Sequence, residues 1–118
     1  MCKMVPFKNG GLVADIKYDQ IVNISQEAQK CKNINRVMLF GSSLEERCTE
    51  RSDIDIAVFG KQTKGKYLLS REYKDFLHNV FKFDMDQDYD ILYFEEGKKH
   101  NDRIMIDINN GIELFRRV

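Results

Sequence analysis

The sequence predicts an α/β or α+β fold in which helices pack on a small β-sheet. Two observations support this prediction. Apolar residues recur every three or four positions in segments of helical length, and short apolar runs alternate with those segments. The chain of 118 residues is long enough for one modest hydrophobic core. We therefore expect a single domain over 1–118, with 1–17 as a weakly defined lead-in.

The first expected elements are a hairpin or a loose extension, followed by a helix. Asn9-Gly10 can turn a small hairpin between 5–7 and 12–13, and a loose lead-in is the alternative interpretation. Over 19–31 the apolar residues recur at helical steps and define one buried face, which consists of Ile21, Ile24, Ala28 and Cys31.

A strand, a short helical stretch and a second strand come next. The apolar run 37–40 predicts a buried strand that is closed by Gly41. Ser42 then opens a short helical stretch, and its spacing to Glu45 matches a capping box. The run 53–58 predicts the second strand.

The second half of the chain continues this alternation. We expect a basic, flexible loop at 61–66 and, after an acidic stretch at 84–90, a third strand at 91–94. Between them, 69–83 predicts a helix with a broad apolar face made of Leu69, Tyr73, Phe76, Leu77, Val80 and Phe81.

The last expected elements are a helix and a closing strand. Asn101 is a candidate N-cap for a helix whose apolar residues are Ile104, Ile106 and Ile108. Asn110-Gly111 predicts a left-handed end to this helix, and 112–115 predicts the closing strand.

Composition and charge exclude several classes of function. The 19 basic and 19 acidic residues give a net charge of zero, which argues against nucleic-acid binding through a broad basic surface. The three cysteines are widely spaced and contain no C-x-x-C pair, so we expect neither a zinc site nor a disulfide framework. The first residues lack the apolar core of a signal peptide, and no apolar run reaches membrane-spanning length. We expect a cytoplasmic protein without membrane association.

Two carboxylates in the second strand point to a metal site. Asp53 and Asp55 are two positions apart, so they project from one face of a strand, whereas the alternating apolar residues project from the other. Neighbouring carboxylates raise each other's pKa unless a cation lies between them, and hard oxygen ligands suit Mg²⁺. Aspartate is disfavoured in strands, which makes a solvated edge strand the weaker interpretation.

The acidic stretch supplies a third carboxylate. Asp90 directly precedes the third strand, so we expect it at the edge of the same sheet, with Asp88 as the nearest rival. Asp84 and Asp86 are interpreted as solvated loop charges. The stretch also matches the spacing of a calcium-binding EF-hand, but Tyr89 stands where the sharp turn needs glycine, so we reject calcium binding.

Gly41-Ser42 has two interpretations. At a strand end and a helix start, glycine lets the backbone approach a ligand closely, and free N–H groups favour a phosphate. Taken alone, the pair is better explained as a helix cap. The other candidates are interpreted as solvated or structural: Lys61, Lys64, Lys66, Arg71, His78, His100 and Cys48.

Together these motifs resemble a known family. Gly41-Ser42, ten residues and then Asp53-Ile54-Asp55 resemble the signature of the minimal nucleotidyltransferases, within the polymerase-β-like superfamily. Tyr89-Asp90-Ile91-Leu92 is similar to the strand that carries the third aspartate of that family, and 110–115 is similar to its closing segment. The resemblance implies a small mixed β-sheet with helices packed on it.

The resemblance also implies roles for single residues. Gly41 and Ser42 would hold the β- and γ-phosphates of a nucleotide. Asp53, Asp55 and Asp90 would bind Mg²⁺, in a site for two ions, and Asp90 would help to deprotonate the attacking hydroxyl. The implied reaction is transfer of AMP from ATP to an acceptor hydroxyl, which would make the chain an enzyme.

Single-domain members of this family usually act with a helical HEPN-domain protein. Such pairs resemble toxin–antitoxin systems in which the transferase adenylylates a tyrosine of the HEPN ribonuclease. Two alternatives stay open: a binding module that neutralises its partner by contact, and a transferase for a small molecule. The first gains weight from Glu45 and Glu46, which stand where the family often has arginine and glycine, with Arg47 as the nearest cation. An oligomer is compatible with the sequence.

Overall fold

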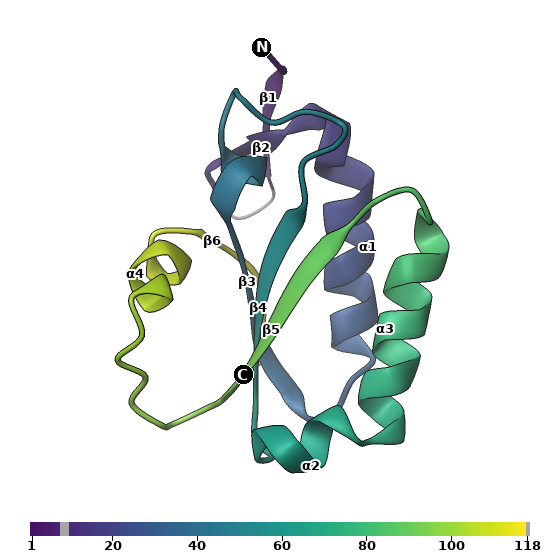
Figure 1. Cartoon of the computed structure of the whole chain (residues 1–118), viewed down its shortest axis with the longest axis vertical. Helices are drawn as coiled ribbons and strands as arrows, with labels where there is room; N and C mark the ends of the chain where they lie inside the picture. The colour runs from purple at the N-terminus through teal and green to yellow at the C-terminus, as the bar shows by residue number, and fades with distance from the viewer. Residues whose placement is uncertain (8–9, 118) are drawn as a thin grey trace.

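A four-stranded mixed sheet with helices on both faces forms the body of the part that the structure describes, in the order β5-β4-β3-β6 (Figure 1). This structure, a computed structural model, describes residues 1–7 and 10–117. It is the α+β architecture with a mixed sheet that the sequence predicts. Its elements in chain order are β1 (Met4–Pro6), β2 (Leu12–Ala14), the 3₁₀ helix η1 (Asp15–Lys17), α1 (Tyr18–Gln29), β3 (Ile34–Phe40), the 3₁₀ helix η2 (Gly41–Leu44), β4 (Ile54–Gly60), α2 (Lys64–Leu68), α3 (Arg71–Phe83), β5 (Tyr89–Glu95), α4 (Ile104–Asn109) and β6 (Ile112–Arg116).

Strand directions place the starts of β4 and β5 at the same end of the sheet. β3 is antiparallel to both of its neighbours, β4 and β6, whereas β4 and β5 run parallel. The connection between β4 and β5 contains α2 and α3, which return the chain to the end where β4 began. In Figure 1 this is the upper end, next to the hairpin of β1 and β2 and the start of α1.

The main core lies between the sheet and the pair α1 and α3. Ile54, Ile56 and Val58 of β4 alternate along the strand and are fully buried against this layer. The helices contribute apolar residues at steps of three and four, as amphipathic helices do: Ile21, Ile24 and Ala28 from α1, and Tyr73, Phe76 and Val80 from α3. The alternation predicted for β4 is therefore confirmed.

A smaller apolar cluster covers the other face of the sheet. Ile108 of the six-residue helix α4 packs there against strand residues whose side chains point away from the main core. These residues are Met38 and Phe40 of β3 and Ala57 and Phe59 of β4. Because successive residues of a strand point to opposite faces, Asp55 of β4 lies on this side, two positions before Ala57.

Most predicted elements are present with shifted ends. The hairpin forms, with Met4 opposite Ala14, although the predicted turn residue Asn9 lies outside the described residues. β3 begins at Ile34 rather than at residue 37, and α1 begins at Tyr18. β5 begins at Tyr89, so Asp90 lies within the strand and not before it.

Four local predictions are wrong. Residues 64–66 belong to the helix α2 and not to a loop, and α3 begins after Ser70, whose hydroxyl accepts from the Tyr73 N–H at 3.1 Å. Leu69, which precedes that cap, is therefore off the apolar face and 77% exposed. Asn101 makes no cap, since α4 starts three residues later. Gly111 does not adopt a positive φ.

Gly111 is needed for space instead. A Cβ at this position would lie 2.1 Å from the carbonyl oxygen of Leu39 in the central strand β3. Glycine therefore allows the turn after α4 to pass directly over the backbone of β3 before β6 pairs with it.

In the described residues, no helix combines the length and the apolar character that crossing a membrane requires. Cys2, Cys31 and Cys48 are free thiols, and the latter two are buried. Burial raises the pKa of Cys31 to about 11 and also raises that of Cys48, so neither thiol is activated as a thiolate.

Replacing Gly111 by alanine is expected to destabilise the protein. The added Cβ would meet a backbone oxygen that β3 cannot move without loss of its pairing, and such overpacking costs about 1–3 kcal/mol of unfolding free energy. Urea denaturation measures this. Gly65→Ala is the matched control, because a Cβ there would meet no described atom within 4 Å. Equal stability of the two variants would contradict the close approach.

Candidate active site

The register between β4 and β5 brings two of the three predicted carboxylates together. Asp55 and Asp90 are direct Cα partners in this parallel pair, so their side chains leave the same face of the sheet. Asp53 stands just before β4, two residues from Asp55. Asp53 and Asp90 are exposed, whereas Asp55 is half-buried. All three lie where β4 and β5 begin.

Burial and mutual repulsion both act on this acidic site, which we define as Asp53, Asp55 and Asp90. The pKa of Asp55 is raised by its burial first, then by the negative charges of Asp90 and Asp53. Within the described part of the chain, no hydrogen bond or ion pair satisfies any of the three carboxylates. A cation bound between these carboxylates would therefore reduce their repulsion.

The residues of the acidic site fit a hard divalent cation in donor type. Carboxylate oxygens are the ligands that Mg²⁺ prefers, and the three lie within or directly before two adjoining strands. As placed, however, no three His, Cys, Asp or Glu side chains of the described residues are close enough together to hold a metal ion. Binding would require these side chains to turn toward a common point.

Gly41 joins the glycine–serine motif to the acidic site. It follows β3, has a φ of +81°, and a Cβ there would lie 2.2 Å from Oδ2 of Asp55. Only glycine offers both this backbone conformation and this space. The two motifs, ten residues apart in the sequence, are therefore in direct contact.

The capping box predicted for Ser42 and Glu45 does not form. The residue at the N-cap position of η2 is Phe40, and no side chain bonds to the free N–H groups there. Ser42 is half-buried, and its hydroxyl makes no hydrogen bond within the described residues. Ser43 beside it is fully buried, and its Oγ has no partner among them either. The cap explanation of Gly41-Ser42 is thus wrong, which leaves its role in phosphate binding as a prediction.

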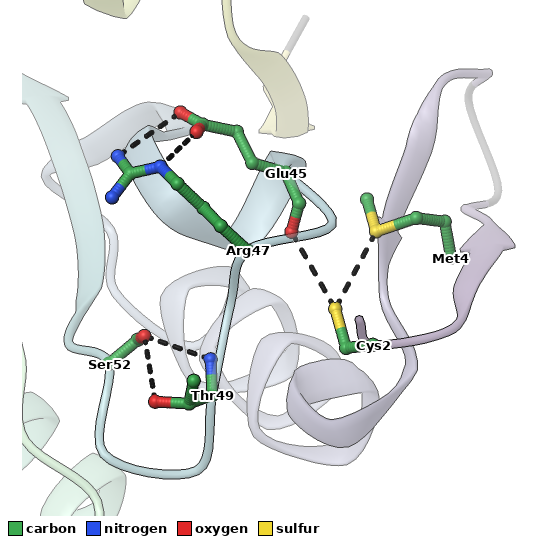
Figure 2. A network of polar contacts seen from close by, with 6 residues as sticks. All are labelled: Cys2, Met4, Glu45, Arg47, Thr49 and Ser52. Carbon is green, nitrogen blue, oxygen red and sulfur yellow. Dashed lines mark hydrogen bonds and ion pairs between the residues drawn. The ribbon is translucent and has the colours of Figure 1, made fainter.

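Glu45 is held by Arg47. Both carboxylate oxygens of Glu45 receive hydrogen bonds from the Arg47 guanidinium, which lowers the pKa of Glu45 and raises that of Arg47 (Figure 2). The charge of Glu45 is therefore compensated locally. Glu46 is exposed, and its carboxylate has no hydrogen bond or ion pair in the described residues. One uncompensated acid, not two, follows η2.

The turn before Asp53 has its own hydrogen-bond network. Ser52 Oγ accepts from the Thr49 N–H at 3.0 Å and lies 3.3 Å from Thr49 Oγ1, as Figure 2 shows. The Ser52 N–H also donates to the Thr49 carbonyl oxygen at 3.0 Å. These hydrogen bonds fix the conformation of the backbone directly before Asp53.

Asp88 contributes its backbone to the sheet. Its carbonyl oxygen accepts from the Ile54 N–H at 3.1 Å, and its carboxylate is not among the charges that raise the pKa of Asp55. Asp90 is thus better placed than its rival to complete the acidic site. The EF-hand spacing has no structural counterpart, because residues 89–95 form β5.

The basic residues after β4 are remote from the acidic site. Lys61 follows the last residue of β4, whereas Asp53 precedes the first, so the seven residues of the strand separate them by about 25 Å. Lys64 and Lys66 are exposed on α2, and Arg71 pairs with Asp75. This agrees with the interpretation of these cations as solvated.

Two buried residues near the acidic site, Lys17 and Gln87, are not predicted from the sequence. Lys17 lies in η1 and bonds to Gln87, which lies between two exposed acids in the turn before β5. No periodic pattern or motif includes either of them, so only the tertiary structure identifies them.

Comparison with known proteins assigns the same region to a family. The model of the family described as polymerase beta, nucleotidyltransferase matches residues 22–117, which include Gly41-Ser42 and the whole acidic site. No curated protein sequence matches the chain significantly.

Gly41→Ala is expected to displace the Asp55 carboxylate and to destabilise the protein. An alanine at this φ carries a strain of about 1–2 kcal/mol, and its Cβ would also overlap Asp55. Gly97→Ala is the matched control, since Gly97 has a φ of +87° and open space around it. Urea denaturation should therefore show the larger loss for Gly41→Ala. An equal loss of unfolding free energy in the two variants would mean that the contact with Asp55 does not contribute to the destabilisation.

Asp55→Asn is expected to stabilise the metal-free protein near pH 7. The folded state holds the Asp55 proton more tightly than the unfolded chain, so wild-type stability falls as pH rises through the raised pKa. Below the ordinary value of 3.8 the carboxyl is protonated in both states, and the advantage of the amide should vanish. Urea denaturation over a pH series measures this difference. An advantage that grows toward acid would show that the raised pKa of Asp55 is not its cause.

Proposed function

The chain belongs to the polymerase beta nucleotidyltransferase family, and from this membership we propose that it transfers AMP from ATP to a protein hydroxyl with the help of Mg²⁺. Family membership establishes a nucleotidyltransferase domain, and such domains generally use Mg²⁺ and a nucleoside triphosphate. The choice of ATP, of a protein acceptor and of its identity belongs to the proposal.

One observation carries the proposal for the site. The register of β4 and β5 sets Asp55 beside Asp90, and the Asp55 carboxylate lies against Gly41. A cation held by these carboxylates would therefore lie next to the backbone of Gly41-Ser42, which is the arrangement that a metal-bound triphosphate needs.

The residues of the site have separable roles in this proposal. Asp53, Asp55 and Asp90 would hold the metal, and the backbone at Gly41 and Ser42, with the unpaired Ser42 hydroxyl, would bind the β- and γ-phosphates. When bound, Mg²⁺ neutralises charge on the transferring phosphoryl group and orients substrate and leaving group. Asp90, on the exposed edge of the site, would accept the proton of the attacking hydroxyl.

The reaction balances as a displacement at the α-phosphorus. The acceptor oxygen forms a bond to this phosphorus while the bond to the β-phosphate oxygen breaks, so pyrophosphate leaves and the acceptor carries AMP. The proton of the acceptor passes to Asp90 and then to solvent. The half-buried position of Asp55 favours its role as a fixed ligand, since it has less freedom than the two exposed aspartates.

We place the acceptor on a partner protein, a tyrosine of a HEPN-type toxin. In the described residues α4 packs on the face that carries the acidic site, and Asp53 and Asp90 stay exposed there, so they are accessible to a side chain presented from outside. The ion pair of Glu45 and Arg47 also removes one of the two charges that favoured an inactive binding module.

Asp53→Asn is expected to abolish transfer of label from [α-³²P]ATP to the partner, and Asp90→Asn to lower it by about 10²- to 10⁴-fold through loss of the base. Asp88→Asn is the matched control, because Asp88 serves the sheet through its backbone. The assay contains the full chain, Mg²⁺ and a HEPN-domain protein as the acceptor.

The outcomes separate the candidate functions. Label on a tyrosine of the partner supports the proposal, and transfer that survives Asp53→Asn contradicts the assigned site. Neutralisation of the partner without any transfer would instead identify a binding module. Equal loss in Asp88→Asn and Asp90→Asn would contradict the role given to Asp90.

A further inference from the structure

Two buried polar side chains, Lys17 and Gln87, connect the segments that lead into the acidic site. Only 1% of Lys17 and 6% of Gln87 is exposed. Lysine is almost never buried so completely unless its ammonium group has defined partners. Because Lys17 and Gln87 are buried near the starts of β4 and β5, we expect their polar groups to have hydrogen-bond partners there.

The contacts form a chain of four hydrogen bonds. The Lys17 ammonium donates to the Glu50 carbonyl oxygen at 3.0 Å and to Gln87 Oε1 at 2.5 Å. The Gln87 Nε2 donates to the carbonyl oxygens of Ser52 at 3.0 Å and of Asp88 at 2.7 Å. Both ends of the Gln87 amide are thus used, and its nitrogen bridges two backbone oxygens.

These bonds tie three parts of the chain together. They join η1, the turn 49–52 before β4 and the turn 84–88 before β5. Ser52 directly precedes Asp53, and Asp88 lies two residues before Asp90. Asp53 stands outside β4, so its position depends on the turn that Lys17 and Gln87 hold.

We propose that Lys17 and Gln87 are positioning residues for the metal site, forming a buried clamp that sets Asp53 and Asp90 at a fixed separation. The clamp acts through the backbone oxygens of Glu50, Ser52 and Asp88. The part of this inference that concerns metal rests on the proposed function, whereas the part that concerns the two turns does not.

The chemistry of the clamp restricts its residues. Two carbonyl oxygens converge on the Gln87 Nε2, and only a donor can lie between them. Glutamate at this position would keep the contact with Lys17. Its second carboxylate oxygen, however, would face the carbonyl oxygens of Ser52 and Asp88 and would repel them. A change from Gln87 to Glu therefore separates the bridging role from simple occupancy of the buried space.

The experiment compares the wild-type full chain with Lys17→Met, Gln87→Leu and Gln87→Glu. Mn²⁺ serves as the probe, and its dissociation constant is measured from the EPR signal of the free ion. Partners that orient metal ligands typically contribute 10- to 100-fold in metal affinity, so we expect each variant to weaken Mn²⁺ binding by about that factor. Amide exchange at Ile54, measured by NMR without metal, should quicken, because the Ile54 N–H bonds to Asp88.

Tyr93→Phe is the matched control. Its hydroxyl accepts from Asn33 Nδ2 at 2.9 Å and donates to the Gln62 carbonyl oxygen at 2.7 Å, a buried network at the opposite end of β5. This variant should lose stability, measured by urea denaturation, and retain wild-type Mn²⁺ affinity. The contrast distinguishes positioning from a general loss of stability.

Several results would overturn the clamp. Folded variants of Lys17 and Gln87 with wild-type Mn²⁺ affinity would do so, and so would a loss of affinity in Tyr93→Phe as large as theirs. If Lys17→Met does not fold, the two Gln87 variants decide. Mn²⁺ binding without nucleotidyl transfer would refute the proposed function alone. If the wild type binds no Mn²⁺, unchanged exchange at Ile54 in the variants refutes the clamp.

Discussion

The parallel pairing of β4 with β5 is the constraint on which the acidic site depends. It holds Asp55 beside Asp90 although their charges repel, and the apolar residues that alternate with them supply the compensating stability. Ile54, Ile56 and Val58 are buried on the opposite face, so the strand cannot slip by one residue without exposing them. The register that the core requires is thus the register that concentrates negative charge.

The N-terminal part of the chain supports this concentration of charge. Lys17, at the end of η1, reaches beneath the surface to the turns that lead into β4 and β5, while the hairpin of β1 and β2 lies at the same end of the sheet. A segment that the sequence presents as a weakly defined lead-in therefore takes part in the architecture around the site. Its sequence is uninformative because the buried residues that it contributes, among them Phe7, Val13 and Lys17, form no periodic apolar face.

Periodic features could be predicted from the sequence, and close contacts could not. The strand alternation around Asp53 and Asp55 and the faces of α1 and α3 follow from repeats of two and of three to four residues. Gly111 shows the limit: the sequence suggests a left-handed conformation, whereas the structure requires glycine because the Leu39 carbonyl is so near. Likewise, the spacing of Ser42 and Glu45 suggests a cap, but Arg47 is close enough to bind the glutamate instead. Such competition between partners is decided in three dimensions.

The contact between Gly41 and Asp55 has a consequence for how such a chain can change over evolutionary time. A side chain introduced at residue 41 would displace a carboxylate from another strand, so one mutation would alter the loop and the acidic site together. A substitution there would need a second change at residue 55 to be accommodated, and that second change would itself remove a carboxylate. We therefore expect residues 41 and 55 to be constrained together, because a side chain at residue 41 and a carboxylate at residue 55 compete for the same space.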